Sequence, residues 1–343
     1  MKKILVTLVI ATLIFTGCQA NVELNEDTFD NSEIINTEVI NAAIESSNIV
    51  LENEQENMEC TPVFFTHRGN IFSLKCNGDI ELVVESRFAS DLNVWEGYLY
   101  YLEFYESERT AIVRFDLENH TKEVLEIGIM SHLTVADGLI FYVERIFLEE
   151  YTHSIPDGIY TLYMRTIDDE TRHAVFSKEE GGRFGHNYQY YEGYIYILVR
   201  PYNNIYRIDL DSHEKVLVYE VMSWPYAPFI IYDGYIYYTV VWHTDLLRRV
   251  NIEGENSEFV IEMPVLMEYR LHNGYVYFVA GENVYKVESD GTNALRIFEG
   301  EWINIAAISC NHVLISRNHD IGGEYQLLLV NSDGSMSYEI VEM

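Results

Sequence analysis

Hydrophobic and polar residues alternate along this chain in short runs, and five of these runs start directly after a polar residue and a glycine. The five segments share this arrangement: Trp95–Tyr100, Ala136–Phe141, Tyr191–Tyr196, Tyr232–Tyr237 and His272–Tyr277. A polar–glycine pair readily takes positive φ, and alternation of large residues is typical of a half-buried strand. Each segment therefore predicts a tight hairpin.

A second pattern follows each hairpin: an apolar strand, a polar turn and another apolar strand, as in Ala111–Leu125. Two further units, around Asn70–Lys75 and Tyr325–Val330, keep only this second pattern. Alignment places Thr61 and Asn311 where the other units have Gly97, Gly138, Gly193, Gly234 and Gly274. A sequence repeat of roughly forty residues built from short strands is typical of a β-propeller with one four-stranded blade per repeat.

The predicted fold is therefore all-β, a propeller of seven four-stranded blades. Six or eight blades are alternatives, because the first unit has no convincing innermost strand: Glu52–Glu59 is too polar. In a closed ring the first and last blades pack against each other, so neither is left exposed at an open end.

The N-terminus is typical of an exported protein. Two lysines follow Met1, and Ile4–Phe15 is an apolar stretch too short to cross a bilayer. The segment Leu13–Cys18 resembles the lipobox of bacterial lipoproteins, which implies removal of residues 1–17 and acylation of Cys18. The alternative is an ordinary cleaved signal with an incidental cysteine. Lipidation would place the protein outside the cytoplasm, anchored to the bacterial cell membrane by acyl chains.

Residues 18–59 form a predicted acidic tether, and residues 60–343 form the predicted propeller. Between Asn21 and Glu59 there are eleven acidic residues and no lysine or arginine, which favours an extended, disordered segment. The whole chain carries a net charge of −33. This charge disfavours nucleic acid and anionic lipid surfaces as partners. We expect a monomer whose only membrane contact is the lipid anchor.

The segment Tyr237-Tyr238-Thr239, followed by Leu247–Asn256, resembles the tyrosine-tryptophan-threonine-aspartate repeat of low-density-lipoprotein-receptor propellers. Residues 60–343 are also similar to bacterial extracytoplasmic lipoproteins with an uncharacterised propeller domain of related type. The resemblance implies the fold and assigns no activity, because propellers host unrelated functions. Val240 stands where the receptor repeat has its aspartate, so the receptor's ladder of acidic side chains is not expected here.

Propeller topology sorts the connections onto two faces. The turns that join the first strand of a blade to the second, and the third to the fourth, lie on one face, here called the turn face. The second-to-third loops and the blade junctions lie on the other, the loop face, where the long insertions Ile146–Gly158 and Ser177–Asn187 fall. Binding residues concentrate in such loops. The predicted ligand-binding residues are Arg200, Tyr202, Trp224, Tyr226, Trp242, His243 and Trp302.

These aromatic side chains have two interpretations. They can stack on sugars or hold a peptide, with nearby acids favouring cationic groups, or they can wedge between blades and hold the ring together. No nucleophile elbow, zinc-protease motif or phosphate-binding glycine loop is present, and no catalytic residue, metal or cofactor is predicted. Cys60, Cys76 and Cys310 map to turns of the first and last units, and the prediction favours no disulfide among them.

The sequence therefore predicts a membrane-anchored, extracytoplasmic binding protein whose loop face recognises a protein, a peptide or a cell-wall glycan. The alternatives are a propeller hydrolase or lyase with its site at the central channel, and a non-catalytic assembly scaffold.

Overall fold

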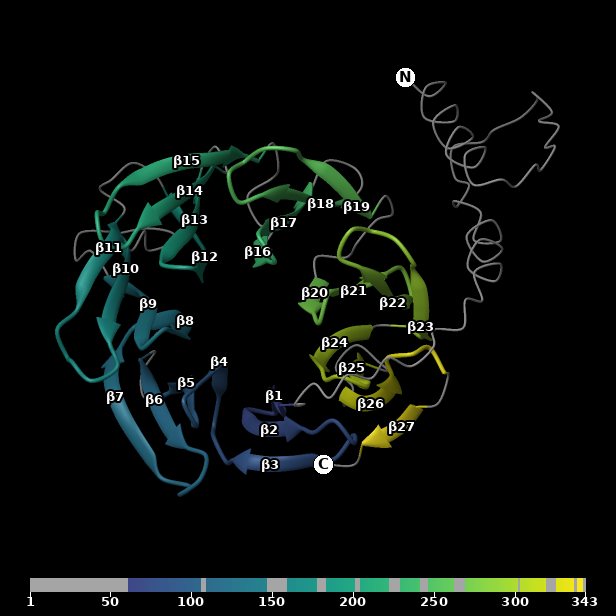
Figure 1. Cartoon of the computed structure of the whole chain (residues 1–343). Coiled ribbons are helices and arrows are strands. Elements are labelled where there is room, and N and C mark those ends of the chain that lie inside the picture. The colour runs from purple at the N-terminus through teal and green to yellow at the C-terminus, as the bar shows by residue number, and fades with distance from the viewer. Residues whose placement is uncertain are drawn as a thin grey trace, which may run out of the picture. The chain divides into compact units, whose positions relative to one another are not determined.

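The computed structural model describes residues 61–105, 109–146, 159–177, 183–200, 204–221, 229–240, 246–261, 269–301, 303–318, 325–335 and 338–341. The chain divides into two compact units, Met1–Ile49 and Val50–Met343, and all described residues belong to the second. In this part of the chain every regular element is a strand. The strands form seven sheets arranged in a ring around a central channel (Figure 1).

Each sheet is a blade of consecutive antiparallel strands, numbered in chain order. Blade 1 holds β1 (Val63–His67), β2 (Asn70–Leu74) and β3 (Ile80–Val84); blade 2 holds β4 (Ala89–Trp95), β5 (Tyr98–Phe104), β6 (Thr110–Asp116) and β7 (Lys122–Gly128); blade 3 holds β8 (Met130–Ala136), β9 (Leu139–Ile146), β10 (Ile159–Thr166) and β11 (His173–Ser177). Blade 4 holds β12 (Arg183–Tyr191), β13 (Tyr194–Arg200), β14 (Asn204–Asp209) and β15 (Lys215–Glu220); blade 5 holds β16 (Phe229–Tyr232), β17 (Tyr235–Val240), β18 (Leu246–Asn251) and β19 (Glu258–Ile261). Blade 6 holds β20 (Tyr269–His272), β21 (Tyr275–Ala280), β22 (Asn283–Glu288) and β23 (Leu295–Glu299); blade 7 holds β24 (Ile303–Ile308), β25 (His312–Asn318), β26 (Tyr325–Asn331) and β27 (Tyr338–Val341).

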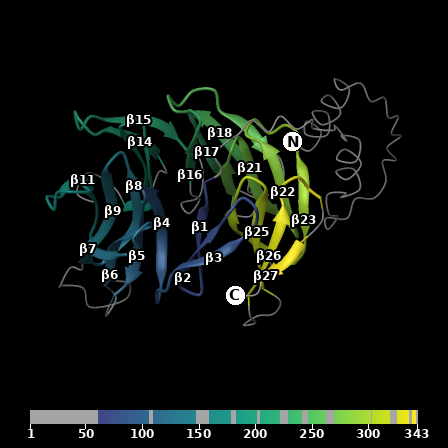
Figure 2. The ribbon, with the colours of Figure 1, turned by 60° about the horizontal axis from the view of Figure 1, so that its bottom comes forward.

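The structure confirms the predicted seven-bladed propeller. In every four-stranded blade the first strand lines the channel and the fourth lies at the rim (Figure 1). Viewed from the side, the strands run between the two faces that carry the connections (Figure 2). No helix among the described residues is long and apolar enough to cross a membrane.

The polar–glycine pairs form the predicted turns between the first and second strands. Glu96 has φ 47° and Gly97 has φ 82°, and Asp137 and Gly138 repeat the pattern with 49° and 74°. Positive φ at both central residues is the type I′ turn, which matches the twist of the paired strands. The repeated phrase therefore acts as a hairpin signal, as the sequence predicts.

The three described strands of blade 1 are its second, third and fourth. The evidence is the turn between β1 and β2, where the amide of Ala89 at the next blade junction donates to the carbonyl of Gly69 at 3.0 Å. Blade 6 has the same contact at its second-to-third turn, where the Gly300 amide donates to the Glu282 carbonyl at 2.8 Å. Residues 52–59, which the sequence analysis finds too polar for an innermost strand, lie outside the described residues.

Tyrosines of the repeated phrase build the interior of the blades. The second tyrosine of the phrase is buried in four blades, as Tyr100, Tyr196, Tyr237 and Tyr277. The first tyrosine lies under a cation from the third strand, as in Arg249 over Tyr235 at 4.4 Å from the ring centroid. Tyrosine combines a large apolar ring, a polar hydroxyl and a ring face that attracts cations. The same residue type can therefore fill the buried position and the position covered by a cation.

Polar side chains join neighbouring blades around the channel. Asn93 of β4 donates through Nδ2 to the Leu133 carbonyl at 3.0 Å and accepts from the Val135 amide at 3.1 Å. Gln189 of β12 makes the matching pair with the Phe229 carbonyl and the Ile231 amide, at 3.1 and 2.6 Å.

Arg270 of β20 takes the same position and donates through Nε to the Ile305 carbonyl at 3.2 Å. We call Asn93, Gln189 and Arg270 the inner clasp residues. They connect blades 2 to 3, 4 to 5 and 6 to 7.

Two buried tyrosines make the reverse connections. The Tyr188 hydroxyl of blade 4 donates to the Phe141 carbonyl of blade 3 at 2.9 Å and also contacts the His132 carbonyl. The Tyr269 hydroxyl of blade 6 donates to the Tyr237 carbonyl of blade 5 at 2.9 Å. Burial raises the pKa of both hydroxyls, so they remain protonated donors. Blades 2 to 7 are thus linked in sequence around the channel.

The expectation that favoured no disulfide is wrong at Cys76, which is disulfide-bonded; Cys60 lies outside the described residues. Cys76 lies in the turn between the third and fourth strands of its blade. In blade 2 the corresponding turn lies close to the first-to-second turn, where the Leu117 amide donates to the Gly97 carbonyl at 3.1 Å. Cys310 keeps its thiol, which accepts from Asn273 Nδ2 at 3.9 Å.

Candidate functional site

Most of the predicted site residues lie outside the described part of the chain. This applies to Cys18, Tyr202, Trp224, Tyr226, Trp242, His243 and Trp302. Arg200 is the last residue of β13, and its backbone pairs with Arg183. The role of these residues in binding therefore remains a prediction.

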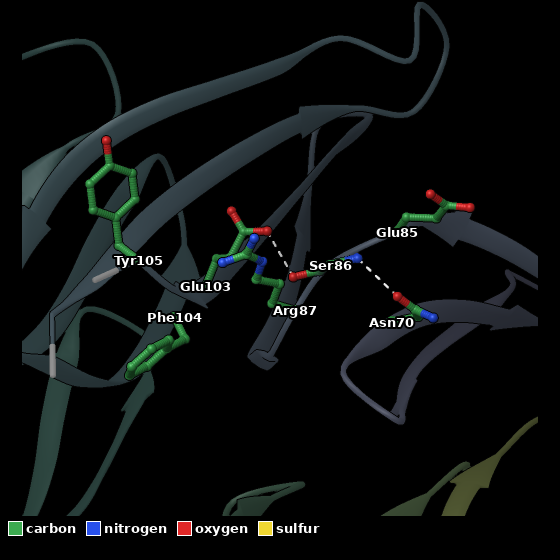
Figure 3. Close-up of a pocket in the computed structure, with 7 residues that line it drawn as sticks. All are labelled: Asn70, Glu85, Ser86, Arg87, Glu103, Phe104 and Tyr105. Atoms are coloured by element: carbon green, nitrogen blue, oxygen red, sulfur yellow. Dashed lines mark hydrogen bonds between the residues drawn. The ribbon is translucent and has the colours of Figure 1, made fainter. Parts of the chain in front are cut away.

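The described residues contain a pocket of about 560 Å³ on the loop face, at the junction of blades 1 and 2 (Figure 3). Its lining comes from three places in the chain: Asn70 at the start of β2, Glu85–Arg87 between β3 and β4, and Glu103–Tyr105 at the end of β5. The sequence predicts a site on this face but places it at other blades.

A glycine allows the two blades to meet at this pocket. Gly69 has φ 86°, and a Cβ added there would lie 2.4 Å from the backbone oxygen of Arg87. Any side chain would therefore collide with backbone rather than with a movable group. The Gly69 carbonyl also accepts from the Ala89 amide at 3.0 Å, which fixes the start of β4. The junction residues 85–88 are held against blade 1 as a result.

Hydrogen bonds fix the polar floor of the pocket. The Ser86 amide donates to Asn70 Oδ1 at 2.9 Å, and the Ser86 hydroxyl donates to Glu103 Oε1 at 2.8 Å (Figure 3). The other carboxylate oxygen of Glu103 accepts from Lys122 Nζ at 2.5 Å. Glu103 is only 14 % exposed, and Lys122 and Ser86 bind its two carboxylate oxygens. Its negative charge is therefore neutralised within the protein and is not available to a ligand.

Two exposed aromatic rings, Phe104 and Tyr105, line the pocket, and Phe88 is exposed beside it. Phe88 is 73 % exposed, Phe104 is 48 % exposed and Tyr105 is 45 % exposed. The Phe104 amide donates to the Phe88 carbonyl at 3.0 Å, so these two residues lie opposite each other where β4 and β5 meet. Phe104 and Tyr105 lie on one side of the pocket and Glu85 on the other (Figure 3). Exposed large apolar side chains at one place on a surface are typical of an interaction site.

The pocket also offers a cation. Arg87 is exposed and lines the pocket, and among the described residues it makes no ion pair. A guanidinium presents a fork of N–H donors to carboxylates and carbonyls. The site therefore combines an apolar aromatic rim, a donor that can meet a carboxylate or carbonyl, and an exposed acid, Glu85.

The sequence analysis missed this pocket because it chose candidate residues around the tryptophans of the loop face. The available signal was the placement of Arg87-Phe88 at a predicted blade junction and of Phe104-Tyr105 at the end of a predicted strand. Both positions belong to the loop face in the propeller scheme, where a core-forming role for a phenylalanine is not expected. Among the described residues, no group of three or more histidine, cysteine, aspartate or glutamate side chains forms a metal-binding arrangement.

Comparison with known proteins identifies the fold. No family model matches the sequence, and no curated protein matches it. Among solved structures, a prolyl endopeptidase aligns with a TM-score of 0.58 and 9 % identity over 82 % of this chain and 49 % of that one. This chain thus spans about half the length of that enzyme.

Two similar structures match over most of their own length. A chain from a nidogen–laminin complex has a TM-score of 0.51 and 10 % identity over 68 % of this chain and 91 % of that one. An oligogalacturonate lyase in complex with manganese has a TM-score of 0.53 and 11 % identity over 76 % and 82 %. At these identities the similarity shows that the chain is a β-propeller, a class that includes hydrolases, lyases and binding proteins.

Proposed function

We propose that this protein is a binding protein that recognises an extended segment of a polypeptide with the loop-face pocket at the junction of blades 1 and 2. The observation that carries the proposal is the pair of exposed rings, Phe104 and Tyr105, that line a pocket together with Arg87, next to the exposed Phe88. Rigid aromatic anchors and arginine dominate the energetics of protein interfaces.

A polypeptide fits this chemistry better than a glycan. Two of the three exposed rings are phenylalanines, which have no hydrogen-bonding group and gain most from covering apolar side chains. Arg87 can donate to peptide carbonyls or to an acidic side chain, while Glu85 at the opposite side suits a basic one. A peptide that combines an apolar residue with charged neighbours would use all these groups.

We also propose that residues 1–17 are removed and that Cys18 carries a lipid anchor, so that binding takes place outside the cytoplasm. The support is the lipobox-like segment Leu13–Cys18 after an apolar stretch. Fractionation of cells that express the full chain tests this proposal. A Cys18→Ser variant should lose membrane association, and equal membrane retention would contradict the lipid anchor.

The binding proposal is tested with the full chain against a display library of random linear peptides and against soluble cell-wall glycan fragments. Truncating an interface anchor costs about 2 kcal/mol, so each of Phe88→Ala and Phe104→Ala should weaken the best peptide about thirtyfold. Phe259→Ala is the matched control, because Phe259 is 46 % exposed but lies on β19 at the rim of blade 5.

Three outcomes would count against this function. The first is the absence of enriched peptides, and the second is glycan binding without peptide binding. The third is an equal affinity of the wild type and the Phe88→Ala and Phe104→Ala variants, with thermal unfolding unchanged in all of them.

A further inference from the structure

The acceptors at the floor of the loop-face pocket are already engaged within the protein. One carboxylate oxygen of Glu103 accepts from the Ser86 hydroxyl at 2.8 Å, and the other accepts from Lys122 Nζ at 2.5 Å. Asn70 Oδ1 accepts from the Ser86 amide at 2.9 Å. A ligand in this pocket therefore meets few acceptors at its floor, and the donors that remain decide its chemistry.

The side-chain amide of Asn70 supplies one set of donors. A backbone N–H can only donate, so the atom of Asn70 that faces the Ser86 amide is Oδ1, and the outer atom is Nδ2. Figure 3 shows Nδ2 on the side of the amide that points away from Ser86. Nδ2 carries two N–H groups, and among the described residues no hydrogen bond uses them.

Arg87 supplies a cation to the same pocket. Its backbone is well fixed, because the preceding residue, Ser86, is bonded through both its amide and its hydroxyl. The backbone oxygen of Arg87 also lies close to Gly69, where an added Cβ would be only 2.4 Å away. The Arg87 side chain is exposed, and within the described part of the chain its guanidinium makes no hydrogen bond or ion pair. This cation is therefore available to a ligand.

A carboxylate suits these donors better than a neutral carbonyl. A guanidinium matches both oxygens of a carboxylate with two parallel hydrogen bonds, and charge-assisted hydrogen bonds are about twice as strong as neutral ones. A carboxylate also has about four lone-pair sites, whereas a carbonyl has two. One carboxylate can therefore accept from Arg87 and from Asn70 Nδ2 together.

The other lining residues indicate where this carboxylate comes from. Phe104 and Tyr105 lie on one side of the pocket and Glu85 on the other, with Arg87 between them (Figure 3). A segment that covers the rings with an apolar side chain and also reaches Glu85 has to continue past Arg87 in both directions. The carboxylate then belongs to an aspartate or glutamate side chain and not to the end of a chain.

We propose that the loop-face pocket selects polypeptide segments that carry an acidic side chain next to an apolar one, with Arg87 and Asn70 Nδ2 binding the carboxylate. This inference rests on the proposed peptide-binding function and adds the selectivity of the same site. The whole chain has 55 acidic and 22 basic residues, and that balance alone would favour basic partners. A preference for acidic segments is therefore a property of this pocket and not of the overall charge.

Defined peptide pools test the selectivity with the full chain. Three pools have the form acetyl-X-X-Phe-Z-X-X-amide, in which X is a mixture of uncharged residues and Z is Glu, Gln or Lys. A fourth pool, acetyl-X-X-X-X-Phe, has a free C-terminal carboxylate. Fluorescence anisotropy should show that the Glu pool binds about tenfold more tightly than the Gln pool, and that the Lys pool binds most weakly.

Two variants and one control assign the selectivity to residues. Arg87→Gln should remove the preference for the Glu pool and leave the affinity for the Gln pool unchanged, because the rings are still present. Asn70→Asp keeps an acceptor for the Ser86 amide but replaces the Nδ2 donors by a carboxylate oxygen, so it should weaken the Glu pool about tenfold. Arg68→Gln is the matched control, because Arg68 is an exposed arginine between β1 and β2 that does not line the pocket. Thermal unfolding verifies that each variant is folded.

The possible results separate this inference from the proposed function. Equal affinities for the Glu and Gln pools, or tightest binding of the Lys pool, would overturn the acidic selectivity and leave peptide binding intact. Tightest binding of the pool with the free carboxylate would overturn the assignment to a side chain. A Glu preference that survives Arg87→Gln would overturn the role of Arg87. If none of the pools binds, the peptide-binding function fails and this inference fails with it.

Discussion

Replacing Gln189 by leucine removes one complete clasp between blades 4 and 5 while keeping the size of the side chain. Gln189 donates to the Phe229 carbonyl at 3.1 Å and accepts from the Ile231 amide at 2.6 Å. Leucine can do neither, so both backbone groups of β16 lose their partner. Since β16 has only four residues, these two bonds are a large share of what fixes its position.

The expected cost follows from the two lost bonds. Leaving a buried polar group without a partner costs about 1–3 kcal/mol. Gln189 is only half-buried at the channel, so water can replace part of each bond and the lower end of the range applies. We expect a loss of about 2 kcal/mol in the free energy of unfolding, which corresponds to a decrease in Tm of about 3–4 °C for a domain of this size.

Thermal unfolding followed by circular dichroism measures this decrease, and hydrogen exchange at Ile231 localises it. Glu170→Leu, an exposed change in the turn between β10 and β11, is the control. A Tm within 1 °C of the wild type, together with unchanged protection of the Ile231 amide, would refute the view that the inner clasps hold the blades together.

Two further predictions concern backbone strain and pH. Gly69→Ala should lower Tm more than Gly97→Ala, because both glycines have φ above 80° but only Gly69 has backbone within reach of a Cβ, at 2.4 Å; equal losses in a thermal melt would contradict this reading. Burial lowers the pKa of His132, so this imidazole is neutral in the folded protein, and the unfolded chain binds the extra proton below about pH 6.5. Stability should therefore fall as the pH drops below that value, and His132→Asn should show a smaller difference in Tm between pH 7.5 and 5.5 than the wild type.

The propeller was predictable because its signals are local and repeated. A hairpin such as Glu96-Gly97 needs only a backbone that takes positive φ, and the run of large residues in Tyr98–Phe104 predicts the strand, which is buried on both faces at Leu99–Leu102. Seven repetitions of the same local signal set the number of blades, even where Thr61 and Asn311 replace the glycine. The tyrosines proved to be structural at their buried positions, as Tyr237 and Tyr277 show.

The loop-face pocket could not be located in the same way. Its residues are brought together by the packing of blade 2 against blade 1, which sequence periodicity does not encode. Nothing in the local sequence around Asn70 predicts that its side chain accepts from the Ser86 amide. Glu103 is buried because Ser86 and Lys122 of β7 bind its carboxylate. The exposure of Phe88 depends on the path of the chain between β3 and β4.

Each blade in this structure consists of strands that are consecutive in the chain, including the described strands of blades 1 and 7. Among the described strands the last blade donates none to the first, and blades 1 and 7 pack together through apolar side chains such as Phe65, Leu74 and Leu314. Between the described strands of these two blades there is no shared hydrogen-bonded ladder that a duplication event would have to preserve. A whole blade could be gained or lost during evolution without changing the strand pairing of the other blades. For the same reason, new chain termini could be engineered at a blade junction without changing the fold.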